Sequence, residues 1–420
     1  MSHRLHTLPN GLRIAIAPMP HVETTSIGVW VDVGGRHERA DENGVAHMLE
    51  HMAFKGTARR TARGIAEEIE GAGGYINAYT SREQTAYYAR VLKDDLPLAA
   101  DIVADIVLNS TFPEEELARE RDVVRQEIAQ VNDTPDDLIF DLLQEAAYPD
   151  QAVGRSILGK PERVGRFQRA ELQDFMGRGY AASRMVLAAA GSVDEDALLK
   201  LAEGLFGDLG SPHDCEPEPG LWRGGSKIDD RDIEQVHLAI GLNGVAYDDP
   251  DFPATQVLAG LLGGGMSSRL FQEIRERRGL AYSTFAFAGS MMDGGMFGVY
   301  AATDPEALAE LQPVLADEIR RTAEEVTEEE TARARAQMKA GMVMSLESSS
   351  ARLEQVARQA LIYGEPQETD AWLARVDAVT ADEVMRVARR LFRTGDAPAM
   401  AVIGPAGSLK DGSGFTERFL

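Results

Sequence analysis

The chain has 420 residues, of which 44% are hydrophobic and 26% are charged, values close to the averages of soluble globular proteins. This composition excludes the disordered and fibrous classes, and the length favours two domains of roughly 200 residues each. The 43 basic and 68 acidic residues leave a formal net charge of -25 at pH 7. Such a charge excludes long-range attraction of nucleic acid and favours cationic partners such as basic peptides.

The sequence contains no recognisable targeting or membrane segment. No run of about 18 apolar residues occurs, and the N-terminus MSHRLHTLPNGLRIAIA lacks the apolar core and cleavage pattern of a signal peptide. The single cysteine, Cys215, excludes an internal disulfide and a cysteine-only zinc cluster. We therefore expect a protein of a reducing compartment, the bacterial cytoplasm, with no membrane partner.

Alternating apolar residues predict a strand near the start of each half of the chain. The first alternation is Ile27, Val29, Val31 and Val33, and the second is Val236, Leu238, Ile240 and Leu242. Between them, the segment SPHDCEPEPGLWRGGSK interrupts every apolar period with Pro, Gly and charged residues. We predict an N-terminal domain at 1–210, an interdomain linker at 211–227 and a C-terminal domain at 228–420.

The two halves also end alike. In the first half Leu172 lies eight residues after Val164, and the strand MVLAAAG closes at Gly191. In the second half Val384 lies eight residues after Val376, and AMAVIG closes at Gly404. This repeat predicts an α+β fold of two homologous units, each an antiparallel or mixed sheet with helices on one face.

The segment NGVAHMLEHMAF carries the candidate chemistry, because His47, Glu50 and His51 form the pattern H-x-x-E-H. On a helix, these three side chains project from one side while an apolar stripe occupies the other. Two imidazoles one turn apart can bind one Zn²⁺, and a carboxylate between them can take a proton from metal-held water. The pattern therefore predicts a zinc-dependent hydrolase with one zinc ion per chain and Glu50 as general base.

A third protein ligand is expected, since a catalytic zinc commonly has three and keeps one position open. The helix PEEELARERDVVRQEIAQV offers Glu120 and Glu127, which lie two turns apart on the flank of its apolar stripe. Carboxylates in such a place are unfavourable unless they are paired or bind a metal. Spacing alone does not choose between the two glutamates.

Together, four segments resemble the pitrilysin and insulinase family of metallopeptidases, most closely the β subunit of mitochondrial processing peptidase and its bacterial relatives. The resemblance covers nearly the whole chain. It rests on GVAHMLEHMAFKGT, GGYINAYTSREQTAYYARV, ERDVVRQEIAQV and SSRLFQEIRERRGLAYS. It implies that Glu127 is the third zinc ligand beside His47 and His51, and that Glu120 is the auxiliary carboxylate that supports the site.

The resemblance further implies an exposed edge strand beside the zinc. That strand would include Asn77, Ala78, Tyr79 and Thr80 and would bind an extended substrate by strand addition. Phe54 would contribute to a side-chain pocket that biases the cleavage position.

In the second half, Arg275 and Tyr282 match the family's pair that grips the substrate and stabilises the tetrahedral intermediate. No histidine-rich helix occurs there, since DFPATQVLAGLLGG occupies the equivalent place, so the second half resembles a non-catalytic copy.

In the family four such units enclose a clam-shell chamber, and this chain supplies half of one. We therefore expect a homodimer whose active site is shared between chains, cleaving unfolded peptides or presequence-like segments by metal-hydroxide attack. The alternative is a non-catalytic structural or partner subunit on the same fold.

Overall fold

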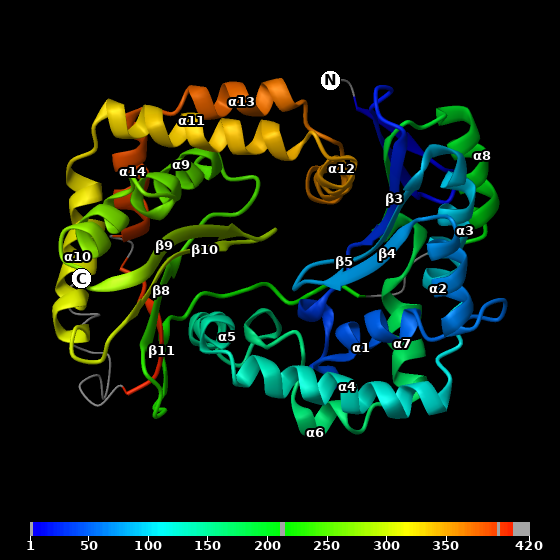
Figure 1. The fold of residues 1–420 in the computed structure, drawn as a ribbon, viewed down its shortest axis with the longest axis horizontal. Coiled ribbons are helices and arrows are strands. Elements are labelled where there is room, and N and C mark those ends of the chain that lie inside the picture. The colour runs from blue at the N-terminus through cyan, green and yellow to red at the C-terminus, as the bar shows by residue number, and fades with distance from the viewer. Residues whose placement is uncertain (1–2, 211–214, 393–394, 406–420) are drawn as a thin grey trace. The chain divides into compact units, whose positions relative to one another are not determined.

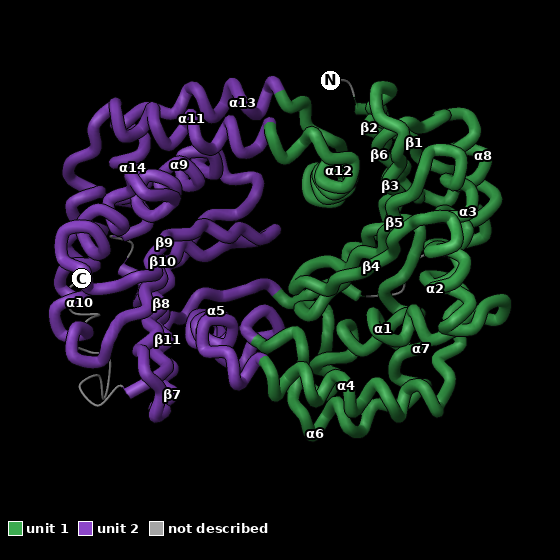
Figure 2. Tube along the Cα trace, in the orientation of Figure 1, with its two compact units in different colours: residues 1–130, 155–218, 344–369 green, residues 131–154, 219–343, 370–420 purple. Residues whose placement is uncertain are grey.

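The computed structural model describes residues 3–210, 215–392 and 395–405, and the chain forms two compact units (Figures 1 and 2). Unit 1 contains residues 1–130, 155–218 and 344–369, and unit 2 contains residues 131–154, 219–343 and 370–420. None of the described helices combines the length and the apolar character that crossing a bilayer requires.

Unit 1 is built on a six-stranded sheet with the order β1-β2-β6-β3-β5-β4. Its strands are β1 (Arg4–Thr7), β2 (Arg13–Pro18), β3 (Thr24–Val31), β4 (Tyr75–Thr80), β5 (Thr85–Leu92) and β6 (Met185–Gly191). β2 and β6 are parallel, whereas β6, β3, β5 and β4 pair antiparallel in turn. The helices that lie largely in unit 1 are α1 (Val45–Ala53), α2 (Ala62–Gly71), α3 (Leu96–Leu108), α4 (Glu114–Asn132), α6 (Pro161–Val164), α7 (Arg169–Gly179), α8 (Glu195–Phe206) and α12 (Ser349–Tyr363).

Unit 2 is built on a five-stranded sheet with the order β7-β11-β8-β10-β9. Its strands are β7 (Gly225–Asp229), β8 (Val236–Asn243), β9 (Ala281–Ser290), β10 (Gly295–Thr303) and β11 (Ala399–Ile403). The helices that lie largely in unit 2 are α5 (Pro135–Ala147), α9 (Phe252–Gly263), α10 (Leu308–Glu324), α11 (Glu328–Ser345), α13 (Thr369–Asp377) and α14 (Ala381–Phe392). The short helices are η1 (Gly35–His37), η2 (Ala40–Glu42), η3 (Lys93–Asp95), η4 (Ala152–Gly154), η5 (Ala182–Arg184) and η6 (Phe271–Glu276), of which η6 is a π-helix.

The two sheets repeat one topology, which confirms the predicted α+β fold of two similar units. In unit 2, β7 and β11 are parallel and the remaining neighbours pair antiparallel, as β2, β6, β3, β5 and β4 do in unit 1. The repeat extends to single residues. Gly191 and Gly404 both have positive φ, at 118° and 124°. A Cβ on Gly191 would lie 2.3 Å from Thr24 O, at the start of β3, and a Cβ on Gly404 would lie 2.5 Å from Gln235 O, just before β8.

Each sheet carries helices on both faces, whereas the sequence predicted helices on one face only. In unit 1 the larger core lies under α1, α3, α7 and α8, and α12 covers the other face with Leu353, Val356, Ala357 and Ala360. In unit 2, α5 covers the second face in the same way. The strands explain this second layer, because Trp30 of β3 is buried on the face opposite Ile27 and Val29.

The helices on these second faces come from the other half of the sequence, so the compact units differ from the contiguous domains predicted at 1–210 and 228–420. Helix α12 belongs to unit 1 and α5 to unit 2. The predicted linker also differs in its later part, because Trp222 packs against Tyr148 and β7 begins at Gly225. The beginning of that linker, 211–214, lies outside the described residues.

Candidate metal centre and active site

Helix α1 presents the predicted histidines from a firmly packed base. Val45, Met48, Leu49 and Met52 are at most 2% exposed and form the apolar stripe. The helix begins after Gly44, whose φ of 95° suits glycine. With the stripe held in the core of unit 1, His47, Glu50 and His51 project together from the other side of the helix.

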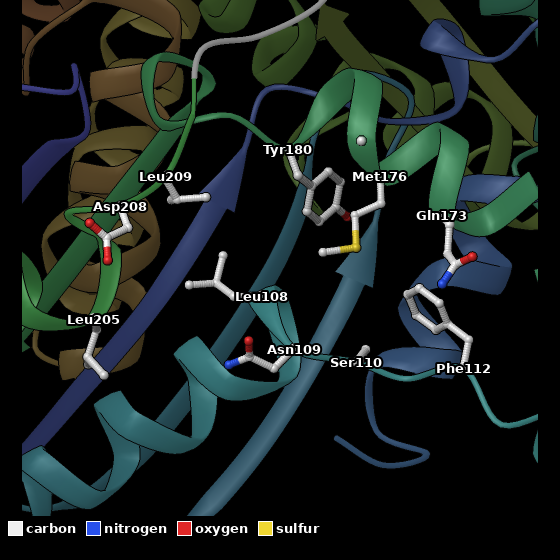
Figure 3. Close-up of a pocket in the computed structure, with 11 residues that line it drawn as sticks. Leu108, Asn109, Ser110, Phe112, Gln173, Met176, Tyr180, Leu205, Asp208 and Leu209 are labelled. Carbon is white, nitrogen blue, oxygen red and sulfur yellow. The ribbon is translucent and has the colours of Figure 1, made fainter. Parts of the chain in front are cut away.

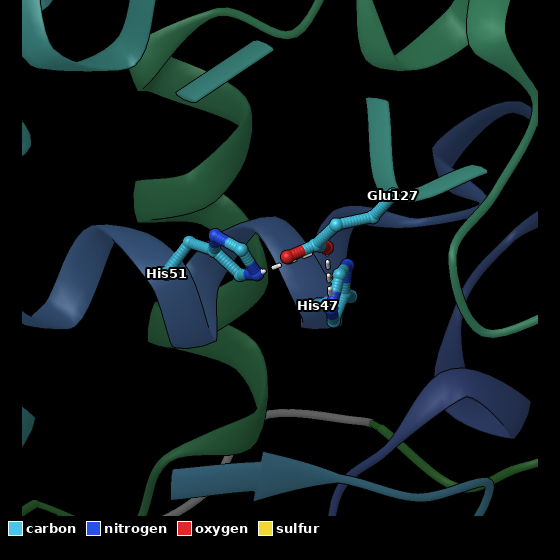
Figure 4. A group of neighbouring side chains, drawn as sticks. All are labelled: His47, His51 and Glu127. Atoms are coloured by element: carbon cyan, nitrogen blue, oxygen red, sulfur yellow. Dashed lines mark ion pairs between the residues drawn. The ribbon is translucent and has the colours of Figure 1, made fainter. Parts of the chain in front are cut away.

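Helix α4 brings Glu127 to the two imidazoles (Figure 4). The Oε2 atom of Glu127 lies 3.7 Å from His47 Nε2 and 3.4 Å from His51 Nε2. The two rings are 4.6 Å apart at an angle of 68°. The structure thus assembles the three residues predicted as metal ligands, and it places Glu127, not Glu120, against both rings.

The donor set fits a zinc ion. Two ligands at 2.0–2.2 Å from a tetrahedral zinc lie roughly 3.3–3.6 Å apart. The Glu127 oxygen lies within this range from His51 Nε2, at 3.4 Å, and just above it from His47 Nε2, at 3.7 Å. Two neutral imidazoles and one carboxylate also form a set that catalytic zinc sites use. The side chains of His47 and His51 are 12% and 16% exposed, whereas Glu127 is 39% exposed, so the group is open on the side of the carboxylate.

Glu120 supports the site from behind His51. Its Oε2 lies 2.9 Å from His51 Nδ1, and its Oε1 lies 2.7 Å from Lys55 Nζ. Burial by itself would raise the pKa of Glu120, but His51 and Lys55 outweigh burial and lower it. The carboxylate therefore stays ionised, orients the ring through Nδ1, and leaves Nε2 of His51 directed at Glu127.

The two histidines differ in their surroundings. Burial lowers the pKa of His47 to about 3, with His51 adding to the effect, so this imidazole is neutral as a metal ligand requires. Burial would also lower the pKa of His51, but the hydrogen bond to Glu120 and the charges of Glu127 and Glu50 raise it. Nδ1 of His47 is buried and has no hydrogen-bond partner among the described residues.

Glu50 lies on α1 between the two histidines of the ligand group. Burial is the main cause that raises the pKa of its carboxyl group, and Thr80 of β4 is the largest opposing influence. Its Oε2 is buried and makes no hydrogen bond within the described part of the chain. A carboxyl group with a raised pKa and a free oxygen suits general acid and base chemistry.

Strand β4 lies at the edge of its sheet and pairs only with β5 among the described strands, as predicted for the strand of Asn77, Ala78, Tyr79 and Thr80. The Tyr79 side chain is held within unit 1, because its hydroxyl accepts a hydrogen bond from Trp30 Nε1 at 3.1 Å. Phe54 ends α1 and is half-buried against the core of unit 1.

Arg275 and Tyr282 lie together in unit 2. The Arg275 guanidinium sits 4.1 Å from the centre of the Tyr282 ring, and its Nη1 donates to the Tyr282 carbonyl at 3.1 Å. Arg275 belongs to the π-helix η6, an irregularity that is frequent at functional sites. The Tyr282 side chain is 75% exposed, which leaves its hydroxyl accessible.

Sequence reasoning missed two residues around the site, Lys55 and Glu38. Lys55 lies four residues after His51, and this spacing was the available signal that it shares the ring's surroundings. Glu38 lies in the loop before α1, where no helical period points to a role.

A pocket of about 520 Å³ elsewhere in unit 1 contains none of the candidate metal ligands (Figure 3). Its lining combines apolar side chains such as Leu108, Phe112 and Met176 with polar ones such as Asn109, Gln173 and Asp208. The ligand group of Figure 4 is not part of this lining, and the candidate chemistry stays with α1 and α4.

Comparison with known proteins agrees with this site. Residues 13–161 match the sequence profile described as Insulinase (Peptidase family M16), and residues 166–338 match the one described as Peptidase M16 inactive domain. An uncharacterized zinc protease of Rickettsia bellii is 40% identical over 399 residues, which cover 95% of this chain and 96% of that protein. A probable mitochondrial-processing peptidase subunit beta of Arabidopsis thaliana is 38% identical over 430 residues, covering 99% and 81%.

The fold is shared as well. The crystal structure of a protease from Helicobacter pylori superposes with a TM-score of 0.89 at 23% identity and covers 96% of this chain and 99% of that one. The profile of an inactive domain agrees with the prediction that the second half is a non-catalytic copy. The zinc proteases among the relatives and the ligand group of α1 and α4 identify the cofactor as zinc. The chain therefore belongs to the insulinase family of zinc-dependent metallopeptidases, peptidase family M16.

Proposed function

We propose that the chain is an endopeptidase that cleaves unfolded peptides at a zinc site made by His47, His51 and Glu127. The observation that carries this proposal is the convergence of three donors beside Glu50, a buried carboxyl group with an unpartnered oxygen. A structural subunit would have no use for this arrangement, since a buried carboxylate without a partner is unfavourable.

Zinc, when bound, polarises a carbonyl and lowers the pKa of water. Glu50 takes the proton of the water that attacks the scissile carbonyl and then passes it to the leaving nitrogen as the C–N bond breaks. Its raised pKa favours this return of the proton. Glu120 holds the His51 ring, and Arg275 and Tyr282 donate to the substrate and to the oxygen that gains negative charge.

The substrate binds in extended form. The free edge of β4 supplies backbone groups for an added strand, and Thr80 brings that edge next to Glu50. Backbone pairing accepts varied sequences, while a side-chain pocket that includes Phe54 biases the cleavage position. The net charge of -25 favours basic segments among these peptides.

The active unit is a homodimer in which zinc of one chain works with Arg275 and Tyr282 of the other. The support is that, within the described part of the chain, the candidate ligand group lies in unit 1 and the Arg275–Tyr282 pair lies in unit 2. The Arabidopsis relative is itself named as a subunit, so a non-identical partner is the competing outcome.

Two measurements test the proposal. Zinc content and hydrolysis of a quenched fluorescent peptide library, with cut sites read by mass spectrometry with and without chelator, should both be positive. Purified chain that binds zinc and cleaves nothing, alone or as a dimer, would leave the non-catalytic subunit as the better description.

Mixing tests the shared site. A Glu50→Gln chain and a Tyr282→Phe chain, mixed and allowed to exchange, should regain activity well above either parent. No gain in a mixture shown by mass to contain heterodimers would rule out sharing.

A further inference from the structure

A buried carboxylate outside the ligand group holds the start of the metal-binding helix. Glu38, in the loop between η1 and η2, is 3% exposed. Its Oε2 accepts hydrogen bonds from Gly44 N–H at 2.9 Å and Asn43 Nδ2 at 3.1 Å, and its Oε1 accepts from Ala46 N–H at 2.8 Å. Burial raises the pKa of this carboxyl to about 7 against the opposing effect of these donors.

Two of these donors, the backbone N–H groups of Gly44 and Ala46, lie at the start of α1, where the helix itself offers no acceptor. The first amides of a helix have no acceptor within the helix, and a side chain at the N-cap commonly supplies one. Here the N-cap is Gly44, which has no side chain. Glu38 reaches in from six residues earlier and accepts these hydrogen bonds instead, and in its ionised form it also complements the helix dipole.

The first turn of α1 carries His47, and this ligand depends on the helix backbone more than His51 does. The His51 ring is fixed through Nδ1 by Glu120. The His47 ring has no such partner for its Nδ1 among the described residues. Fraying of the first turn would therefore displace His47 before it displaces His51.

The loop that carries Glu38 is itself pinned. A Cβ on Gly44 would lie 2.8 Å from Leu158 O, and a Cβ on Gly159 would lie 2.5 Å from Asn43 O, so the two loops are in close backbone contact. Asn43 Nδ2 also donates to Ser156 O at 2.9 Å. Glu38 is thus a fixed acceptor on a rigid support.

The same loop contacts the hairpin that ends β4. Gly35 N–H donates to Ser81 O at 3.0 Å, and Arg36 N–H donates to Arg82 O at 2.8 Å. One loop therefore connects the metal-binding helix to the proposed substrate strand.

From this geometry we infer that Glu38 is a positioning residue for zinc binding, acting through the first turn of α1 on His47. The inference rests on the proposed ligand role of His47. Loss of the Glu38 carboxylate should weaken zinc affinity, because His47 is then no longer held in place before the ion binds. Loss of a helix cap elsewhere in the unit should leave zinc affinity unchanged.

The test compares Glu38→Ala with Asp194→Ala. Asp194 caps α8 in the same unit by accepting from Ala197 N–H at 3.0 Å, and α8 carries none of the proposed ligands. Zinc affinity is measured by competition with a chromophoric chelator, and ligand geometry by the visible spectrum of the Co²⁺-substituted protein. We expect Glu38→Ala to weaken zinc binding roughly tenfold, as loss of supports around ligands does, and to alter the cobalt spectrum, with Asp194→Ala within twofold of wild type.

Glu38→Gln keeps the side-chain volume and one acceptor oxygen, and it decides the question if Glu38→Ala does not fold. A folded Glu38 variant with wild-type zinc affinity and cobalt spectrum overturns the inference. His47→Ala distinguishes failure of the proposed ligand set from failure of the proposed role of Glu38. If that variant keeps wild-type affinity, the proposed ligand set is wrong; if it loses zinc while the Glu38 variants do not, only the role of Glu38 is wrong.

Discussion

Helices α1 and α9 occupy equivalent places in the two repeated units, and they differ in the side chains that they present. Both follow the strand at the centre of their sheet and precede the edge strand. In α9, Gly263 approaches β9 so closely that a Cβ would lie 2.1 Å from Ala286 N. Helix α1 instead keeps the side toward Glu127 polar, and His47, Glu50 and His51 are not among its buried residues.

The two units therefore share a scaffold, while the candidate metal ligands His47, His51 and Glu127 all belong to unit 1. At Gly263 the strand leaves no room for a side chain. Nine of the twelve residues of α9 are buried and none is a histidine or an acid. Mutations can test whether stability of the shared scaffold and zinc binding by unit 1 are independent.

The largest effect is expected for Glu50→Gln. The amide cannot accept the proton, so peptide hydrolysis should fall by about 100- to 10,000-fold, while zinc content and thermal stability stay near wild type. The measurements are kcat/KM on a fluorogenic peptide and metal analysis of the same sample. Substantial turnover in the zinc-loaded variant would remove Glu50 from the mechanism.

The equivalence of the two scaffolds predicts matched losses of stability for Gly191→Ala and Gly404→Ala. Both glycines have positive φ, and an added Cβ meets a backbone oxygen, so each change should cost about 2–3 kcal/mol of unfolding free energy. Gly204→Ala in α8 is the control, because nothing lies within 4 Å of its Cβ position. Urea unfolding gives the free energy of unfolding of all three variants. If either Gly191→Ala or Gly404→Ala has no effect, the two positions are not structurally equivalent.

Glu120→Gln should weaken activity and zinc affinity together, by about 10- to 100-fold. The amide is a poorer acceptor for the His51 ring, and it loses the charge that pairs with Lys55. Glu115→Gln on the same helix is the control, because that side chain is 91% exposed. Equal behaviour of the two variants in a zinc competition assay would deny Glu120 its supporting role.

The smallest effect is expected in unit 2, for the partly buried ion pair of Arg269 and Glu330. This pair should affect the free energy of unfolding and leave zinc affinity unchanged. Burial by itself would raise the pKa of Glu330, but Arg269 and Thr327 outweigh it and lower the pKa to about 2. A depressed carboxyl pKa gives stability that is present above the unfolded value of 4.5 and is lost as pH falls toward 2. Glu330→Gln should therefore remove about 1–2 kcal/mol at pH 6 and less at pH 3.5.

Urea unfolding at the two pH values checks this, with Glu329→Gln as control because the Glu329 side chain is 87% exposed. Zinc affinity should be unchanged in both variants. An effect of Glu330→Gln on zinc binding would contradict the separation of scaffold and chemistry.

Local sequence is enough to predict the helix with the candidate metal ligands, since His47, Glu50 and His51 lie within five consecutive residues and their arrangement follows from helical geometry. It also predicted the α+β class and the repeated unit, because strand alternation and the positions of Gly191 and Gly404 are local signals. The resemblance of ERDVVRQEIAQV to the family selected Glu127, where spacing left Glu120 open.

Features that depend on contacts between distant segments could not be predicted in this way. The helices α12 and α5 cover the second faces of sheets formed by the opposite halves of the chain, which no local period reveals. The hydrogen bonds of Glu120 to His51 and Lys55, and of Glu38 to the first turn of α1, likewise depend on how segments pack. A helical or strand period reports which face of an element is buried, but the partner that covers that face is fixed only when the whole chain folds.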